Sequence, residues 1–108
     1  MIAADFGKDF CWGVSTSAYQ IEGAYNKHGK GLSIWDVYSN TPRKIFQNHN
    51  GNHAADFYHR FKEDIALLKQ LGIKHFRFSI SWPRILPAGT GEINPLGIKF
   101  YHELLDCC

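Results

Sequence analysis

Residues 10–24 read FCWGVSTSAYQIEGA and indicate more about the fold than any other part of the chain. The first half alternates bulky Phe10, Trp12 and Val14 with small residues, and this period of two predicts a buried β-strand. Small residues along one side leave room for another group to approach the backbone. The stretch then turns polar, which places Gln20 and Glu22 at the predicted carboxyl end of the strand. Active sites of α/β barrels are built at such strand ends.

The period of the apolar residues changes after residue 52. They recur at steps of four and three, which predicts one buried face of a helix: Ala54, Tyr58, Phe61, Ile65 and Leu68. Asn52 is expected to cap this helix and Gly72 to end it. Residues 73–82 alternate again and predict a second strand. A strand, a crossover helix and a strand form a βαβ unit, whose strands are parallel in nearly all cases.

The remaining segments are predicted as loops and shorter helices. Ser33 is expected to cap a short helical turn, and a long loop follows over residues 39–51. Long structureless loops in compact domains are usually functional. In a barrel this loop would lie on the face at the carboxyl ends of the strands, over the site. Asn94 and Pro95 predict the cap and first residue of a last helix.

Arg77 lies on the polar side of the second predicted strand, with Ser79 and Ser81. Parallel sheets are covered on both faces, so a charge at this position allows two interpretations. In one, the strand is an edge strand and Arg77 is a surface residue. In the other, a barrel has a polar interior in which the guanidinium faces an anion. The pattern of residues alone does not separate these two interpretations.

Length, charge and cysteine usage limit the class of protein. Residues 1–108 show no linker and no second composition block, so they are expected to belong to a single domain, and the net charge of +2 comes from interspersed basic and acidic residues. We therefore expect no nucleic-acid partner and no membrane partner. Cys11, Cys107 and Cys108 form no disulfide framework and are expected to be reduced thiols. Residues 1–5 lack the features of a secretory signal, so a cytoplasmic location is expected.

No metal or cofactor is expected. His49, His53 and His59 are spaced unlike the ligands of any standard zinc site. The Gly29-Lys30-Gly31 segment lacks the second glycine and the Lys-Ser/Thr pair of a phosphate-binding loop.

Three stretches resemble, in the same order, glycoside hydrolase family 1, the β-glucosidase family. They are residues 10–24, residues 29–36 (GKGLSIWD) and residues 77–85 (RFSISWPRI). The resemblance covers nearly the whole chain and implies an α/β fold, namely the first βαβ(α) portion of a (β/α)8 TIM barrel. An eight-stranded barrel needs about 250 residues, so residues 1–108 are expected to be the N-terminal fragment of a single, truncated barrel domain. Two parallel strands by themselves leave open hydrogen-bonding edges.

The resemblance also implies a function, a retaining β-glucosidase that releases terminal β-linked glucose or a similar sugar from a small β-glycoside. Gln20 resembles the glutamine whose amide binds sugar hydroxyls. Arg77 resembles the arginine that keeps the nucleophilic carboxylate ionised and oriented. Glu22 is expected to have a structural role. The catalytic glutamates of the family stand in Asn-Glu-Pro and Glu-Asn-Gly contexts, and neither context occurs here.

These 108 residues alone are therefore expected to be inactive, and no catalytic residue is assigned among them. The alternative from another class is a non-catalytic module that binds a sugar or a partner chain. A weaker alternative is a small nucleic-acid-binding α/β domain. The oligomeric state is not assigned.

Overall fold

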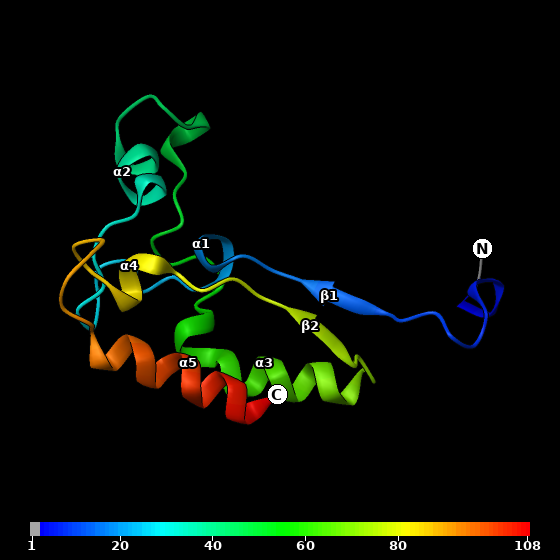
Figure 1. Cartoon of the computed structure of the whole chain (residues 1–108). Helices are drawn as coiled ribbons and strands as arrows, with labels where there is room; N and C mark the ends of the chain where they lie inside the picture. Colours follow the sequence, from blue (N-terminus) through cyan, green and yellow to red (C-terminus); the bar gives the residue numbers. More distant parts are fainter. Residues whose placement is uncertain (1–2) are drawn as a thin grey trace.

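A computed structural model describes residues 3–108, so Met1 and Ile2, part of the leading segment considered above, lie outside the described residues. The chain forms a small parallel sheet with helices packed beside it (Figure 1). In chain order the elements are η1 (Ala3–Phe6), β1 (Gly13–Ser15), α1 (Ala18–Ile21), α2 (Ile34–Asn40), η2 (Phe46–Asn48), α3 (Phe57–Gln70), β2 (His75–Arg77), α4 (Trp82–Ile85) and α5 (Pro95–Cys107).

The sheet confirms the predicted parallel βαβ unit. β1 and β2 are parallel neighbours, with Gly13 opposite His75 and Ser15 opposite Arg77. The long helix α3 lies between these strands in the sequence and beside them in space (Figure 1). Because the strands are parallel and in register, their carboxyl ends meet at the same edge of the sheet.

Both strands are shorter than the alternating patterns predicted. β1 has three residues, and Phe10 and Trp12 before it are 46% and 49% exposed instead of buried. Their rings pack on each other (4.9 Å between centroids) and on Phe6. β2 ends at Arg77, and Trp82 already belongs to α4. Alternation reports which face a side chain prefers, whereas a strand extends only as far as a partner strand accepts its hydrogen bonds.

The core lies where α3 packs against α5 (Figure 1). It contains six buried residues: Phe57, Phe61, Ile65, Phe100, Tyr101 and Leu104. Phe76 and Phe78 pack against this cluster from β2 and the segment after it. The predicted helical face is thus confirmed over most of its length, and the core connects the helices to one face of the sheet.

The boundaries of α3 differ from the prediction at one end only. The helix begins at Phe57, preceded by Asp56 in a left-handed conformation (φ 54°), so Asn52 is not its cap and Ala54 lies outside it. Its end agrees with the prediction, because Gly72 follows with φ +71°. Glycine adopts this conformation without the steric cost that a Cβ would add.

The predicted caps of two other helices are confirmed. Ser33 and Asp36 form a reciprocal capping box at the start of α2. Asn94 accepts a hydrogen bond from the Leu96 N–H (3.2 Å), with Pro95 as the first residue of α5. Cys11, Cys107 and Cys108 form no disulfide among the described residues, and all three are exposed, whereas Cys11 was expected inside the first strand. None of the helices in residues 3–108 is both long and apolar enough to cross a membrane.

Candidate functional site

Gln20 lies in the single turn of α1 and not at a strand end, which corrects the prediction. The chain leaves β1 and is extended at Ser17 (φ −131°), and then Ala18 is held by a hydrogen bond from its N–H to Ser79 Oγ (2.8 Å). Ala18 is also buried, which fixes the start of the turn. Because α1 follows β1 closely, Gln20 remains beyond the carboxyl end of this strand.

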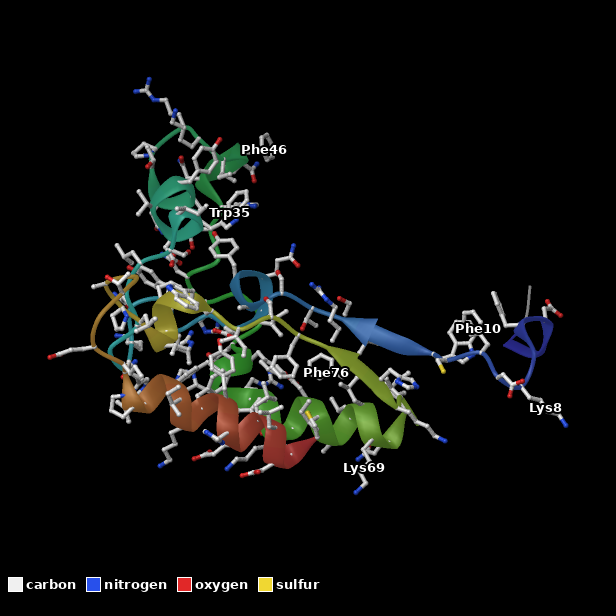
Figure 2. The ribbon with its side chains drawn as sticks, viewed as in Figure 1. Lys8, Phe10, Trp35, Phe46, Lys69 and Phe76 are labelled. Atoms are coloured by element: carbon white, nitrogen blue, oxygen red, sulfur yellow. The ribbon has the colours of Figure 1, made fainter. Side chains whose placement is uncertain are left out.

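Gln20 borders an open cavity of about 310 Å³ between α1, α2 and the loop that precedes α3. The lining residues are Tyr19, Gln20, Trp35, Ser39, Ile45, His49, Asn50, Gly51 and Ala54. None of these is a carboxylate. Trp35, labelled in Figure 2, is 53% exposed and lies beside Tyr19, with 5.9 Å between the ring centroids. The cavity therefore combines aromatic surface with amide, hydroxyl and imidazole groups and no carboxylate, which suits a polar ligand such as one with several hydroxyls.

Arg77 is the last residue of β2 and is exposed in this chain. Its Nη1 donates a hydrogen bond to Ser15 Oγ (3.2 Å) on β1, and its carbonyl accepts one from the Thr16 N–H (2.9 Å). Arg77 does not line the cavity that contains Gln20. The structure thus places both residues beyond or at the carboxyl ends of adjacent strands, without joining them in one cavity. The role of Arg77 beside a carboxylate stays a prediction.

Glu22 lies in a buried hydrogen-bonded cluster with Arg84 and Tyr101. Its two carboxylate oxygens accept from Arg84 Nε (2.9 Å) and from the Tyr101 hydroxyl (2.6 Å). Glu22 and Arg84 are 4% and 1% exposed. The Tyr101 hydroxyl also accepts from the Ser81 N–H (2.7 Å). This cluster joins α1, α4 and α5, and it agrees with the expected structural role of Glu22.

The guanidinium of Arg84 is held on several sides. Nη2 donates to the Gly23 carbonyl (3.1 Å), and the guanidinium carbon lies 4.3 Å from the centroid of the Tyr58 ring. Nη1 is buried and has no hydrogen-bond partner among the described residues. The positive charge is therefore stabilised by the Glu22 carboxylate and by the aromatic face rather than by water. Gly97 allows this packing, because an added Cβ would overlap the Arg84 carbonyl.

The cluster determines the protonation of its members. Burial raises the pKa of Tyr101 far above its usual range, and the negative charge of Glu22 and its hydrogen bond add to this effect. Tyr101 is therefore a permanent hydrogen-bond donor to Glu22. Since both oxygens of Glu22 are engaged, this carboxylate is not available as a general acid or base. The remaining glutamates of the chain lie outside the Gln20 cavity.

A second buried ion pair supports the segment before α2. Lys30 Nζ lies 2.7 Å from Asp36 Oδ2, and the side chains are 6% and 3% exposed. Lys30 also donates to the carbonyls of Tyr25 and Gly31. Burial raises the pKa of Asp36, but hydrogen bonds from Lys30 and Ser33 outweigh it, so the pKa lies below its ordinary value. Asp36 is thus a structural anion.

Sequence reasoning did not identify Arg84 and Tyr101 as partners of Glu22. Arg84 lies in the resembling stretch 77–85, but no role or contact was predicted for it. Tyr101 lies in the segment after Asn94 and Pro95, for which the sequence predicted only a helix. The described residues contain no group of three or more His, Cys, Asp or Glu side chains that could hold a metal ion.

A parallel βαβ arrangement with polar side chains beyond the strand ends defines a partial α/β fold. The sequence model of the family described as "Glycosyl hydrolase family 1" matches residues 2–108, so the chain belongs to this family. The chain is 60% identical to β-glucosidase A of Acetivibrio thermocellus, over 92% of this chain and 22% of that protein. It is 55% identical to the aryl-phospho-β-D-glucosidase BglC of Bacillus subtilis, over 94% of this chain and 21% of that protein.

Solved structures agree with this assignment. The family 1 β-glucosidase of Thermotoga maritima superposes with a TM-score of 0.88 at 50% identity, covering 91% of this chain and 22% of that one. The virulence factor SghA of Agrobacterium tumefaciens superposes with a TM-score of 0.89 at 48% identity, covering 93% of this chain and 22% of that one. The chain thus spans about a fifth of the length of these relatives.

Proposed function

We propose that this chain forms the opening βαβ(α) portion of a (β/α)8 barrel that hydrolyses terminal β-linked glucose, or a similar sugar, from small β-glucosides. Its family membership supports this proposal, and its relatives include proteins named as β-glucosidases. The observation that carries the proposal is the position of Gln20, in a cavity with aromatic walls and no carboxylate, beyond the carboxyl end of β1. Barrel enzymes bind their substrates at this end of the strands.

Gln20 and Arg77 have different roles in this proposal. The amide of Gln20 offers two donors and an acceptor without charge, which matches the hydroxyls of a sugar. The Arg77 guanidinium, free on its exposed side, holds a nucleophilic carboxylate in its ionised form by charge attraction. Retaining glycosidases need two carboxyl groups about 5–5.5 Å apart. In this proposal neither is Glu22, which is engaged by Arg84 and Tyr101.

The proposal is tested with a hybrid enzyme. This chain replaces the matched first part of the Thermotoga maritima β-glucosidase, and hydrolysis of an aryl β-glucoside is measured. We expect the hybrid to be active and the 108-residue chain alone to show no turnover. In the hybrid, Gln20→Ala is expected to lower kcat/KM, and Arg77→Ala to lower kcat with a shifted acidic limb of the pH profile. Glu63→Ala, on the exposed face of α3, is the matched control and is expected to leave both constants unchanged.

Three results would contradict the proposal. The first is an inactive hybrid that melts at the temperature of the parent enzyme. The second is an active hybrid in which Gln20→Ala has no effect. The third is turnover by the chain alone that Glu22→Gln or Glu63→Gln abolishes. Saturable glucose binding by the chain, combined with an inactive hybrid, would favour the non-catalytic binding module instead.

A further inference from the structure

The hydroxyl of Tyr19 joins three segments that are distant in the sequence. From α1 it donates to Ser39 Oγ on α2 (2.7 Å) and accepts from the Gly51 N–H in the loop before α3 (2.9 Å). Ser39 is 4% exposed, so the contact to it is largely shielded from water. A hydrogen bond in such surroundings is strengthened, and leaving one partner unsatisfied is costly.

The loop backbone also rests on the Tyr19 ring. A Cβ added to Gly51 would lie only 2.7 Å from Tyr19 Cζ, which is closer than real side chains approach. The next residue, Asn52, exchanges two amide hydrogen bonds with Asn40 at the end of α2 (2.9 Å each). The end of the loop is therefore clamped between α1 and α2, and the two links come from different helices.

The hydrogen bonds of the Tyr19 hydroxyl to Ser39 and Gly51, called the clamp below, lie at the cavity that contains Gln20. Tyr19, Ser39 and Gly51 all line that cavity, and His49 and Asn50 of the same loop complete the wall beside them. Gln20 immediately follows Tyr19, so one helical turn carries both the proposed sugar ligand and the group that holds this wall. A shift of the loop would change the width of the cavity while leaving Gln20 in place.

We infer that Tyr19 is a positioning residue, whose hydroxyl holds the loop at residues 49–51 against α1 and α2 and thereby sets the shape of the sugar-binding cavity. This inference rests on the proposed function for its kinetic consequence, whereas the clamp itself is independent of it. A positioning role of this kind acts on substrate binding more than on the chemical step, because Tyr19 is not placed beside a reacting carboxylate.

The test uses Tyr19→Phe in the hybrid enzyme, since phenylalanine keeps the ring that supports Gly51 and removes only the hydroxyl. We expect KM for an aryl β-glucoside to rise about tenfold with kcat within about twofold, in line with the loss of two modest hydrogen bonds. Amide exchange of peptides covering residues 46–54 is expected to accelerate about tenfold, with no change in α3. Gly51→Ala keeps the Tyr19 hydroxyl but adds a Cβ that would overlap the Tyr19 ring, so it is expected to push the loop away from α1 and to raise KM in the same way.

Tyr38→Phe is the matched control. Tyr38 lies on α2, is 45% exposed, and makes no side-chain hydrogen bond among the described residues, so neither kinetics nor exchange should change. An active hybrid whose KM is unchanged by Tyr19→Phe, or whose kcat alone falls, would overturn the inference and leave the proposed function intact. A folded but inactive hybrid would overturn the proposed function instead. In that case, unchanged exchange at residues 46–54 would also overturn the clamp, and accelerated exchange would support it.

Discussion

Between α3 and α5, core side chains such as Phe57 and Leu104 are 5% and 1% exposed, whereas Phe10 and Trp12, before β1, are about half exposed. Figure 2 shows the same contrast. Phe76 is directed from β2 toward the helices, and Phe10 lies on the extended arm, away from them. The side formed by α3 and α5, called the closed side below, is covered by the chain's own residues. The side formed by β1 and the segment before it, called the open side, presents apolar surface and unpaired strand edges.

This difference shows how much each kind of element depends on neighbours. A helix satisfies its backbone hydrogen bonds internally, so α3 and α5 need only one apolar face each to form a core. A strand needs partners on both edges, and within the described residues β1 and β2 have only each other. One buried ion pair, Glu22 with Arg84, lies on the closed side and connects α1 with α4, and a second, Lys30 with Asp36, lies at the start of α2.

The largest expected effect concerns the buried ion pair on the closed side. Glu22→Ala leaves Arg84 buried without its carboxylate and is expected to reduce the free energy of unfolding by about 3–5 kcal/mol. Urea unfolding of the chain followed by circular dichroism measures this loss. Glu22→Gln, which keeps the shape and one of the two acceptor oxygens, is the comparison and should cost less. A loss below about 1 kcal/mol for Glu22→Ala would mean that this ion pair does not hold the closed side together.

Neighbouring leucines of α5 sharpen the comparison within one helix. Leu104 is 1% exposed and Leu105 is 57% exposed. Leu104→Ala is expected to cost about 3 kcal/mol through the lost contacts and the cavity that remains. Leu105→Ala should change stability by less than about 0.5 kcal/mol. Equal losses in the same unfolding experiment would show that α5 does not pack as described.

The pH dependence of stability tests the second ion pair. The pKa of Asp36 is below its ordinary value of 3.8 in the folded chain, because hydrogen bonds from Lys30 and Ser33 outweigh the effect of burial. A lowered folded-state pKa contributes stability above the unfolded pKa, and this contribution is lost as the pH falls through the folded value. The difference in unfolding free energy between the native chain and Asp36→Asn should therefore be constant near neutral pH and narrow below about pH 4. A difference that stays constant down to pH 2 would contradict the lowered pKa.

The smallest effect is expected on the open side. Trp12 is half exposed and contacts mainly Phe6 and Phe10, so Trp12→Ala should reduce stability by less than about 1 kcal/mol. Phe57→Ala in the core, expected to cost about 3–5 kcal/mol, is the comparison. A loss above about 2 kcal/mol for Trp12→Ala would show that the arm is covered in solution, and the contrast between the two sides would no longer hold.

Much of the fold and part of the site could be predicted from the residues themselves. The parallel pairing, the face of α3 and the cap at Asn94 were all predicted correctly. The lengths of the strands were not, because Phe10 and Trp12 alternate like buried residues without lying inside a sheet. Gln20 was assigned to the right end of β1 but to the wrong element, since a single helical turn has no pattern long enough to recognise.

The sequence by itself determined the βαβ unit, the caps at Ser33 and Asn94, the end of α3 and the family, because caps, glycine turns and periodicity depend on residues only a few positions apart. Only the tertiary structure decided which groups meet. Glu22 is 62 residues from Arg84 and 79 from Tyr101, and Tyr19 is 32 residues from Gly51. No local pattern encodes such contacts, because they arise when whole elements pack and buried polar groups must find partners.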